Sequence, residues 1–223
     1  ISNAPFAQVA VVWAKNEEGR IKGLLVERGM EGFETPEMHG KHSLRASSTG
    51  ELIFNNVKVP KENLLTEKDG LGAPLMCLDS ARYGIAWGAI GAAMDCYDTA
   101  LRYSKERIQF GKPIGQNQSI QHPLAENWIE LEAAELLIAK AAYQYDNGQN
   151  SGGMANAAKF FAAEAGFKAA TQAIITLGGM GYAKEYHVER LMRESLIPKL
   201  APVSAQMILN YISERVLGLP KSY

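Results

Sequence analysis

The chain has 223 residues, of which 47% are apolar and 21% are charged, as in globular proteins with one large domain or two small ones. Its 23 basic and 24 acidic residues give a formal net charge of −1. Because neither half of the chain is basic, nucleic acids and anionic membrane surfaces are not expected as partners. No segment has the roughly 18 consecutive apolar residues of a membrane-spanning helix, so no membrane insertion is expected.

Residues 1–67 have the pattern of a compact antiparallel β domain. Short apolar runs alternate with Gly, Pro and Asn, and residues 16–19 predict the turn of a hairpin. The chain opens without Met, directly in strand-like sequence, and we expect it to be the middle of a longer protein. The expected strands cover residues 7–13, 21–27, 50–54 and 57–59, and a polar connector covers residues 60–72.

Residues 68–223 have a helical pattern that predicts an up-and-down four-helix bundle. The predicted fold class is therefore α+β, with the β domain preceding the bundle. Three long antiparallel helices and a terminal helix would form the bundle. The expected helices cover residues 73–107, 119–147, 153–177, 186–195 and 204–217.

Several residues of these helices carry specific expectations. Gly84, Gly88 and Gly91 lie on neighbouring turns of the first helix, where each costs about 1 kcal/mol relative to Ala, so close packing of another helix is the expected compensation. Pro123 is expected in the first turn of the second helix, where its missing N–H is tolerated. The apolar side of that helix is expected to contain Leu124, Trp128, Leu131, Leu136, Leu137 and Ile138.

The two cysteines, Cys77 and Cys96, have no disulfide framework around them. They predict buried thiols in a reducing compartment, such as the bacterial cytoplasm or the mitochondrial matrix. There is no Cys-x-x-Cys motif, and the four histidines do not cluster, so no metal site is expected.

The loop after the first long helix contains the residues best suited to bind a ligand. Arg107 offers a fixed charged fork for a phosphate, Phe110 an aromatic face, and Gln118 a donor and an acceptor. A second candidate is the Gly178-Gly179 pair, which allows close backbone approach to a planar or charged ligand. The alternative interpretation is structural: Arg107 caps carbonyls, Phe110 is buried in the bundle, and the glycines end a helix.

The order and spacing of several motifs resemble acyl-CoA dehydrogenases over residues 1 to about 195. The β domain contributes Ile1-Ser2-Asn3 and the segment 41–50, and the bundle contributes Arg107-x-x-Phe110-Gly111 and Gly178-Gly179-x-Gly181-Tyr182. The segment 81–88 (Ala-Arg-Tyr-Gly-Ile-Ala-Trp-Gly) is similar to the glutaryl-CoA dehydrogenase branch. The family's N-terminal helical domain has no counterpart in this chain, so by this resemblance the fold is truncated.

The resemblance implies FAD as the cofactor, with Ser2 bonded to the isoalloxazine ring and the bundle residues holding the pyrophosphate and adenine side across a subunit interface. Ile175 stands where many members have a polar residue in contact with the flavin. The implied cofactor-binding residues are Ser2, Arg107, Gln109, Phe110, Asn117, Gln118, Gly178, Gly179 and Ser204. The implied acyl-CoA channel residues are Cys77, Leu78, Asp79, Ser80, Ala81 and Arg82.

The family's catalytic base is not in either of its usual positions. Where most members have a Glu before the last helix, this chain has Pro202 or Val203, and where other members have it on the first long helix, this chain has Ala81. The catalytic residue is therefore not assigned. Glu194 and Glu214 are the nearest carboxylates in the sequence.

The resemblance implies α,β-dehydrogenation of an acyl-CoA thioester, with a glutaryl-CoA-like thioester as a candidate substrate, in fatty acid or amino acid catabolism. Hydride would pass to flavin N5, electrons to an electron-transfer flavoprotein, and the protein would be a homodimer or homotetramer. The alternative is a catalytically silent flavin-binding or assembly subunit with the same scaffold, as the missing Glu suggests. A third hypothesis is that a partner supplies the missing domain and base.

Overall fold

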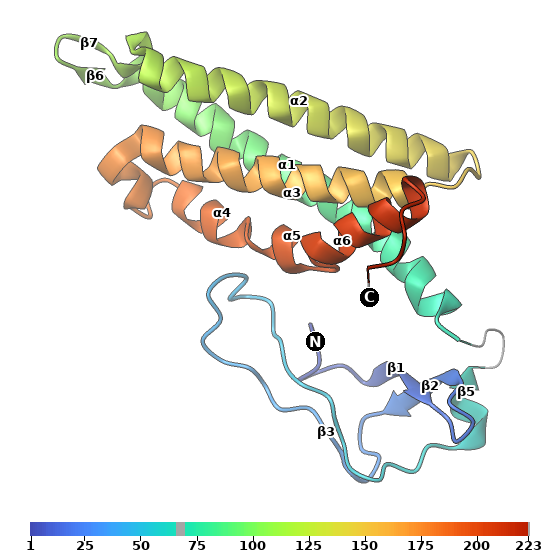
Figure 1. Cartoon of the computed structure of the whole chain (residues 1–223). Helices are drawn as coiled ribbons and strands as arrows, with labels where there is room; N and C mark the ends of the chain where they lie inside the picture. The colour runs from blue at the N-terminus through green and yellow to red at the C-terminus, as the bar shows by residue number, and fades with distance from the viewer. Residues whose placement is uncertain (66–69, 223) are drawn as a thin grey trace. The chain divides into compact units, whose positions relative to one another are not determined.

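The computed structural model describes residues 1–65 and 70–222, and for Asp79 the backbone alone. Contacts between residues divide the chain into two compact units, Ile1–Cys77 and Leu78–Tyr223 (Figure 1). The boundary expected between residues 67 and 68 lies outside the described residues. The helix α1 (Gly72–Glu106) crosses the division, so its first residues belong to the N-terminal unit.

The N-terminal unit contains a three-stranded antiparallel sheet in the order β1 (Val9–Lys15), β2 (Ile21–Glu27) and β5 (Leu64–Leu65). The expected hairpin turn joins β1 to β2, with Gly19 at φ 74° and the Asn16 N–H donating to the Arg20 carbonyl at 2.9 Å. Opposite Trp13, β2 has a glycine, Gly23. A Cβ there would lie 2.8 Å from the indole, so the glycine makes room for the ring.

A second, two-stranded sheet pairs β3 (Phe33–Glu34) with β4 (Ile53–Phe54). Phe33 and Phe54 are directly paired, and their rings stack with centroids 5.1 Å apart. The prediction of a strand over residues 57–59 is wrong, because that stretch has no sheet partner. The expected connector instead forms the turn η1 (Lys61–Asn63) and β5, which the Asn63 side chain ties to β2 through the Leu25 carbonyl at 2.9 Å.

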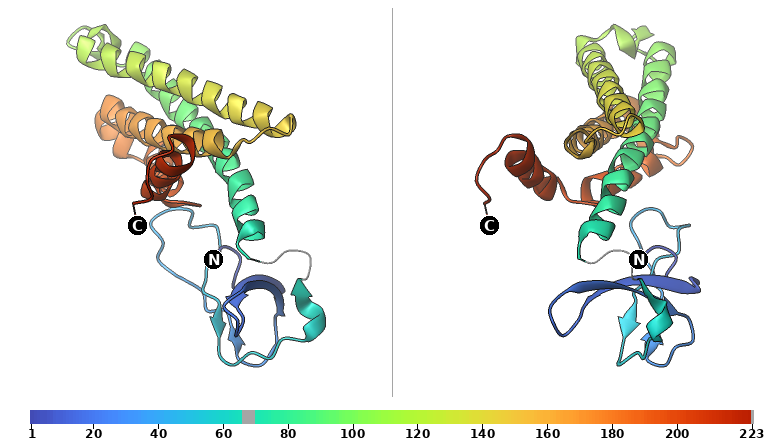
Figure 2. Two further views of the ribbon diagram at one scale, coloured as in Figure 1. Left: turned by 45° about the vertical axis from the view of Figure 1, so that its right-hand side comes forward. Right: turned by 90° about the vertical axis from the view of Figure 1, so that its right-hand side faces the viewer.

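The C-terminal unit is a helical bundle whose long helices are α1, α2 (Gln118–Asp146) and α3 (Gly152–Leu177) (Figures 1 and 2). The fourth side of the bundle was expected to be a terminal helix. It is a row of short helices that pack along α3. They are α4 (Val188–Glu194), α5 (Ile197–Leu200), α6 (Ala205–Tyr211) and the π-helical turn η4 (Ile212–Val216).

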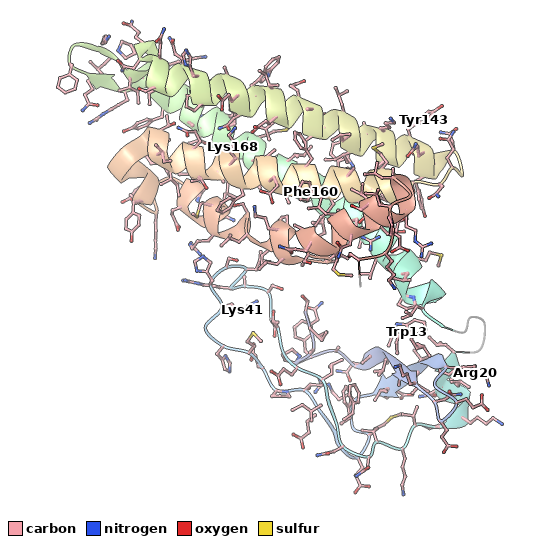
Figure 3. The ribbon with its side chains drawn as sticks, in the orientation of Figure 1. Trp13, Arg20, Lys41, Tyr143, Phe160 and Lys168 are labelled. Carbon is pink, nitrogen blue, oxygen red and sulfur yellow. The ribbon has the colours of Figure 1, made fainter. Side chains whose placement is uncertain are left out.

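Small side chains fill the interface between the three long helices. One buried cluster combines Ala86, Ala89 and Ile90 of α1 with residues of α2 and α3, most of them alanines. At Gly166 of α3 an added Cβ would lie 3.3 Å from the Ala89 carbonyl oxygen, so the two backbones nearly touch. Lys168 of α3 adds ion pairs to Glu126 and Glu130 of α2 at the surface (Figure 3).

Close helix packing therefore occurs at Gly166 and not at the glycines expected to provide it. Gly84, Gly88 and Gly91 are exposed, and an added Cβ at any of them would meet no atom within 4 Å in the described chain. Trp128 and Leu136, expected on the apolar side of α2, are also exposed.

Pro123 is the sixth residue of α2, so it lies in the second turn and not in the first turn as expected. Both cysteines were expected to be buried, but only one of them is. Cys96 is buried and Cys77 is exposed. Burial raises the pKa of the Cys96 thiol from 9.0 to about 12. The nearby Asp95 carboxylate adds to the rise, and Arg190 opposes it.

Replacing Gly166 by valine is expected to push α1 and α3 apart and to lower the free energy of unfolding by about 1–3 kcal/mol. Gly84→Val is the matched control, because the same change at an exposed helical position, where an added Cβ meets no atom within 4 Å, is expected to change stability by less than about 1 kcal/mol. Urea denaturation of both variants measures the difference. Equal stabilities would contradict the close approach at Gly166.

Cys96 is expected to make stability fall at alkaline pH. Its pKa is higher in the folded than in the unfolded chain, so its contribution is complete below pH 9 and is lost as pH rises towards 12. The loss has a slope of at most about 1.4 kcal/mol per pH unit. Denaturation of wild type and Cys96→Ala between pH 8 and 11 tests this, since the variant is expected to lack the slope. Parallel pH curves would show that the thiol is not protected.

Candidate functional site

A short hairpin joins α1 to α2 at one end of the bundle. Its strands are β6 (Ile108–Gln109) and β7 (Lys112–Pro113), and its two-residue loop is Phe110-Gly111. Both loop residues have positive φ, 52° and 79°, as the tightest right-twisted hairpins require. This geometry leaves the Phe110 side chain 95% exposed, so it is not buried in the bundle as the structural alternative assumed.

The return from the hairpin leads directly into α2. The Ile114 N–H donates to the Arg107 carbonyl at 2.9 Å, which fixes the start of the turn η2 (Ile114–Gln116) against the end of α1. Asn117 then precedes the first residue of α2. Its side chain donates to the Ile114 carbonyl at 2.9 Å and does not cap the N–H groups of the helix.

The glycine run lies at the end of α3. Gly178 has φ 61° and its N–H donates to the carbonyls of Ile174 and Ile175, which ends the helix. The following turn, η3 (Gly178–Tyr182), folds back so tightly that a Cβ at Gly181 would lie 2.5 Å from the Ile174 carbonyl oxygen. The ends of α1 and α3 and the start of α2 lie at the same end of the bundle (Figure 1).

A cavity of about 510 Å³ lies between these three helix ends. This volume is within the range of small-molecule sites. Ile175 also lines the cavity, together with residues that the sequence did not single out, Tyr103, Ser119 and Thr176 among them. Five of the expected cofactor-binding residues line it: Arg107, Gln109, Asn117, Gly178 and Gly179.

The electrostatics of this cavity favour an anion on one side. Arg107 is the cation in its lining, and Asn117 and Ser119 mark the N-terminal end of α2, where backbone N–H groups and the helix dipole are positive. Gly178 and Gly179 contribute backbone without side chains to the lining. The lining can therefore hold a phosphate group at the Arg107 side and a flat apolar group beside the glycines.

The other four expected cofactor-binding residues are not in the lining of this cavity. Phe110 extends from the tip of the hairpin, and Gln118 is the exposed first residue of α2. Ser204 begins α6, where its hydroxyl accepts from the Met207 N–H at 3.4 Å. Ser2 belongs to the N-terminal unit, where it bridges to Thr49.

The residues expected to line an acyl-CoA channel are consecutive in α1. Cys77 is exposed and is the last residue of the N-terminal unit. Leu78 and Ser80 are half-buried, Ala81 is exposed, and Arg82 is buried at 6% exposure. The side chain of Asp79 lies outside the described part of the chain.

Pro202 and Val203, at the expected position of the base, are half-buried between α5 and α6. The Val203 carbonyl accepts a hydrogen bond at 2.7 Å from Lys159, a residue of α3 that is only 1% exposed. The pKa of Lys159 is lowered from 10.5 to about 8, mainly by burial and also by the Arg82 charge, while Glu164 opposes the shift. Sequence reasoning missed Lys159.

The two carboxylates considered as substitute bases are both in ion pairs. Glu194 accepts from Arg190 one helical turn earlier at 2.9 Å, and Glu214 pairs with Arg215 at 3.2 Å. In the described parts of the chain, no group of three or more His, Cys, Asp and Glu residues could hold a metal ion. None of the described helices is long and apolar enough to span a bilayer.

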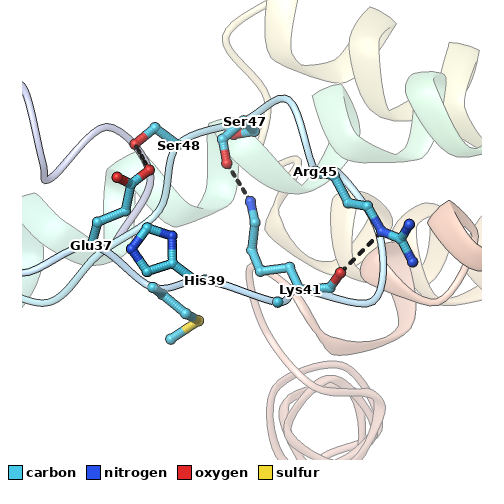
Figure 4. A pocket seen from close by; sticks show the side chains of 8 residues that line it. Glu37, His39, Lys41, Arg45, Ser47 and Ser48 are labelled. Atoms are coloured by element: carbon cyan, nitrogen blue, oxygen red, sulfur yellow. Dashed lines mark hydrogen bonds between the residues drawn. The ribbon is translucent and has the colours of Figure 1, made fainter.

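The N-terminal unit has a smaller cavity, of about 360 Å³, in the segment 37–48 (Figure 4). Lys41 lies in it, but its ammonium donates to the Leu44 and Ser47 carbonyls and to the Thr49 hydroxyl. A lysine has three donors, so these bonds use all of them. Lys41 therefore holds the loop together, and the cavity at the end of the bundle is the stronger candidate site.

Comparisons with known proteins show the family to which the chain belongs. The family described as "Acyl-CoA dehydrogenase, C-terminal domain" matches residues 68–217. An acyl-CoA dehydrogenase of Bacillus subtilis is 38% identical over 98% of this chain and 59% of its own length, and a glutaryl-CoA dehydrogenase of Desulfococcus multivorans is 39% identical over 100% and 59%.

Two crystal structures of a glutaryl-CoA dehydrogenase from Mycobacterium smegmatis have TM-scores of 0.95 and 0.94 to this chain, at 35% and 33% identity. The second was solved in complex with FADH2. Both matches cover 100% of this chain and 57% of the crystallised chain. This chain thus spans less than two thirds of the length of these relatives, and the family match over residues 68–217 shows that it belongs to the acyl-CoA dehydrogenase family.

Proposed function

We propose that this chain binds FAD and takes part in the α,β-dehydrogenation of an acyl-CoA thioester. The observation that carries the proposal is the cavity at the end of the bundle, lined by Arg107, Gln109, Asn117, Gly178 and Gly179. A relative with a nearly identical fold is known in complex with FADH2, which supports FAD as the ligand of this cavity.

The residues present fit a dinucleotide. Arg107 and the N-terminal end of α2 would hold the pyrophosphate, and Gln109 and Asn117 supply amide groups for hydrogen bonds on the adenine side. The backbone of Gly178 and Gly179 allows the close approach that a flat or charged group needs. Ser2, Gln118 and Ser204 remain in the proposed cofactor site by family resemblance alone.

The exposed Phe110 supports an oligomer. Its aromatic ring is 95% exposed at a hairpin tip, where a second molecule can cover it and bury its apolar surface. In the proposed arrangement, a second copy of the protein brings its cofactor to this hairpin, so that each site is completed across an interface. A homodimer or homotetramer fits this arrangement.

In the proposed reaction, a base removes a proton from the α-carbon of the thioester while the β-carbon gives up a hydride. The flavin supplies the hydride acceptor at N5 when it is bound. Residues 77–82 of α1 would line the acyl-CoA channel. We also propose an electron-transfer flavoprotein as acceptor, residues 1–67 as part of the middle β domain and residues 68–223 as the C-terminal domain.

A second candidate is a catalytically silent FAD-binding or assembly subunit. It is favoured by Pro202 and Val203 at the expected base position and by the ion pairs that hold Glu194 and Glu214. Both candidates use the same cofactor site. They differ in whether an acyl-CoA thioester can reduce the bound flavin.

Arg107→Ala is expected to weaken FAD binding by about ten- to a hundredfold, the effect of losing a charge-assisted hydrogen bond. Arg102→Ala is the matched control, because Arg102 is an exposed arginine of α1 that does not line the cavity. Titration of the apoprotein with FAD, followed by flavin fluorescence, gives both affinities. Equal affinities for the two variants would remove Arg107 from the site.

Anaerobic mixing with butyryl-CoA, isovaleryl-CoA and glutaryl-CoA separates the two candidate functions. An active dehydrogenase is expected to lose its oxidised flavin absorbance near 450 nm with at least one of these thioesters. Dithionite gives the fully reduced control spectrum. A yellow protein that none of the thioesters bleaches would favour the silent subunit, and a colourless one would contradict both candidates.

A further inference from the structure

Lys159 is the largest side chain that is fully buried in the described part of the molecule. Burial of an ammonium costs free energy, and an apolar side chain of similar volume is often as stable or more stable in such a place. Its lowered pKa, about 8, is the signature of that cost. A charge retained at this cost points to a role beyond packing.

The hydrogen bond of Lys159 reaches across from α3 to the non-helical residues 201–204. It ends on the Val203 carbonyl, at 2.7 Å. Pro202, the preceding residue, has no N–H with which to continue the helical bonding of α5. Ser204 on the other side is engaged in capping α6. Lys159 therefore holds the middle of the segment 201–204, at a point where neither α5 nor α6 makes a helical hydrogen bond to it.

The preceding helix has its own tether to α3. Lys199 of α5 pairs with Glu164 at 2.5 Å and lies over the Phe167 ring, 5.1 Å from its centroid. α5 is thus fixed before the segment and α6 packs on α3 after it. These contacts leave the backbone at Pro202 and Val203 free to take different paths between α5 and α6. The hydrogen bond from Lys159 fixes one of them.

We propose that Lys159 is a positioning residue for acyl-group binding, which holds the Val203 backbone so that Pro202 and Val203 keep their place beside the acyl chain. The identity of the acyl ligand rests on the proposed function. The tether itself rests on the Lys159–Val203 contact. Lys159 does not touch the acyl chain in this proposal, since it is only 1% exposed, and it acts through the segment.

The test compares Lys159→Met with Lys168→Met in the FAD-loaded protein as it occurs naturally. Lys168 is on the same helix, but it is exposed and pairs with Glu126 and Glu130 of α2. The first readout is amide hydrogen exchange of peptides that cover residues 197–211. The second is the affinity for acetoacetyl-CoA, whose β-carbon is already oxidised and has no hydride to give, followed by the flavin spectrum.

Lys159→Met is expected to speed exchange in residues 203–207 and to weaken acetoacetyl-CoA binding about tenfold, as for a lost hydrogen bond to a charged donor, while FAD remains bound. Lys168→Met is expected to match wild type in both. Faster exchange with unchanged affinity would show a structural tether without a positioning role, and unchanged exchange would remove the tether. A wild-type protein that does not bind acetoacetyl-CoA would instead contradict the proposed function.

A pH series on wild type keeps the inference testable if Lys159→Met does not fold. Above pH 8 the amine is neutral, so its bond to Val203 loses charge assistance. The charged groups around it are Arg82 from α1, Glu164 from α3 and Lys199 from α5. This series uses crotonyl-CoA, because acetoacetyl-CoA loses its own acidic α-proton in this pH range. Crotonyl-CoA affinity is expected to fall several-fold between pH 7 and 9, equally in wild type and Lys168→Met. A flat profile over this range would overturn the inference.

Discussion

The close approach of α1 and α3 is the constraint on which the rest of the helical unit depends. Gly166 lets the backbone of α3 come against the Ala89 carbonyl of α1, and alanines such as Ala86, Ala134 and Ala162 fill the interface with α2. Small side chains leave few alternative packings, so the helices meet in one register. The positions of the helix ends, and of the cavity between them, follow from that register.

The candidate site is built almost entirely from residues that leave or enter helices. Arg107 follows α1, Asn117 precedes α2, and Gly178 ends α3. The first backbone N–H groups of α2 have no partner within their own helix, and Arg107 and the backbone of Gly178 line the same cavity. The packed helices hold their ends rigidly in place, and the residues at those ends supply the groups that can contact a ligand. Few specialised residues are therefore needed.

Periodicity in the sequence was sufficient to predict the long helices, since a spacing of three to four residues between apolar positions requires a helix. The hairpin at residues 16–19 followed from its turn residues. The strand β5 could not be predicted, because two residues carry no pattern. The exposure of Gly84, Gly88 and Gly91 could not be predicted either, because which face of a helix meets a neighbour depends on tertiary contacts.

Within the site, motif spacing was enough to select five residues that the fold brings to one cavity, because they flank turns whose geometry is local. Lys159 was missed because lysine is normally solvated. A signal was present, however. Lys159 lies at helical spacing from the buried Ala155, Ala162 and Gly166, so its place on the buried face of α3 could have been recognised.

The two-residue loop Phe110-Gly111 fixes the register of β6 against β7, and thereby the path of the chain between α1 and α2. Successive residues of a strand point to opposite sides, so one residue added to or deleted from the loop would shift β7 against β6 and turn Lys112 and Pro113 to the opposite side. Surface loops usually tolerate changes of length better than buried segments do. We therefore expect this loop to tolerate changes of residue type better than changes of its two-residue length.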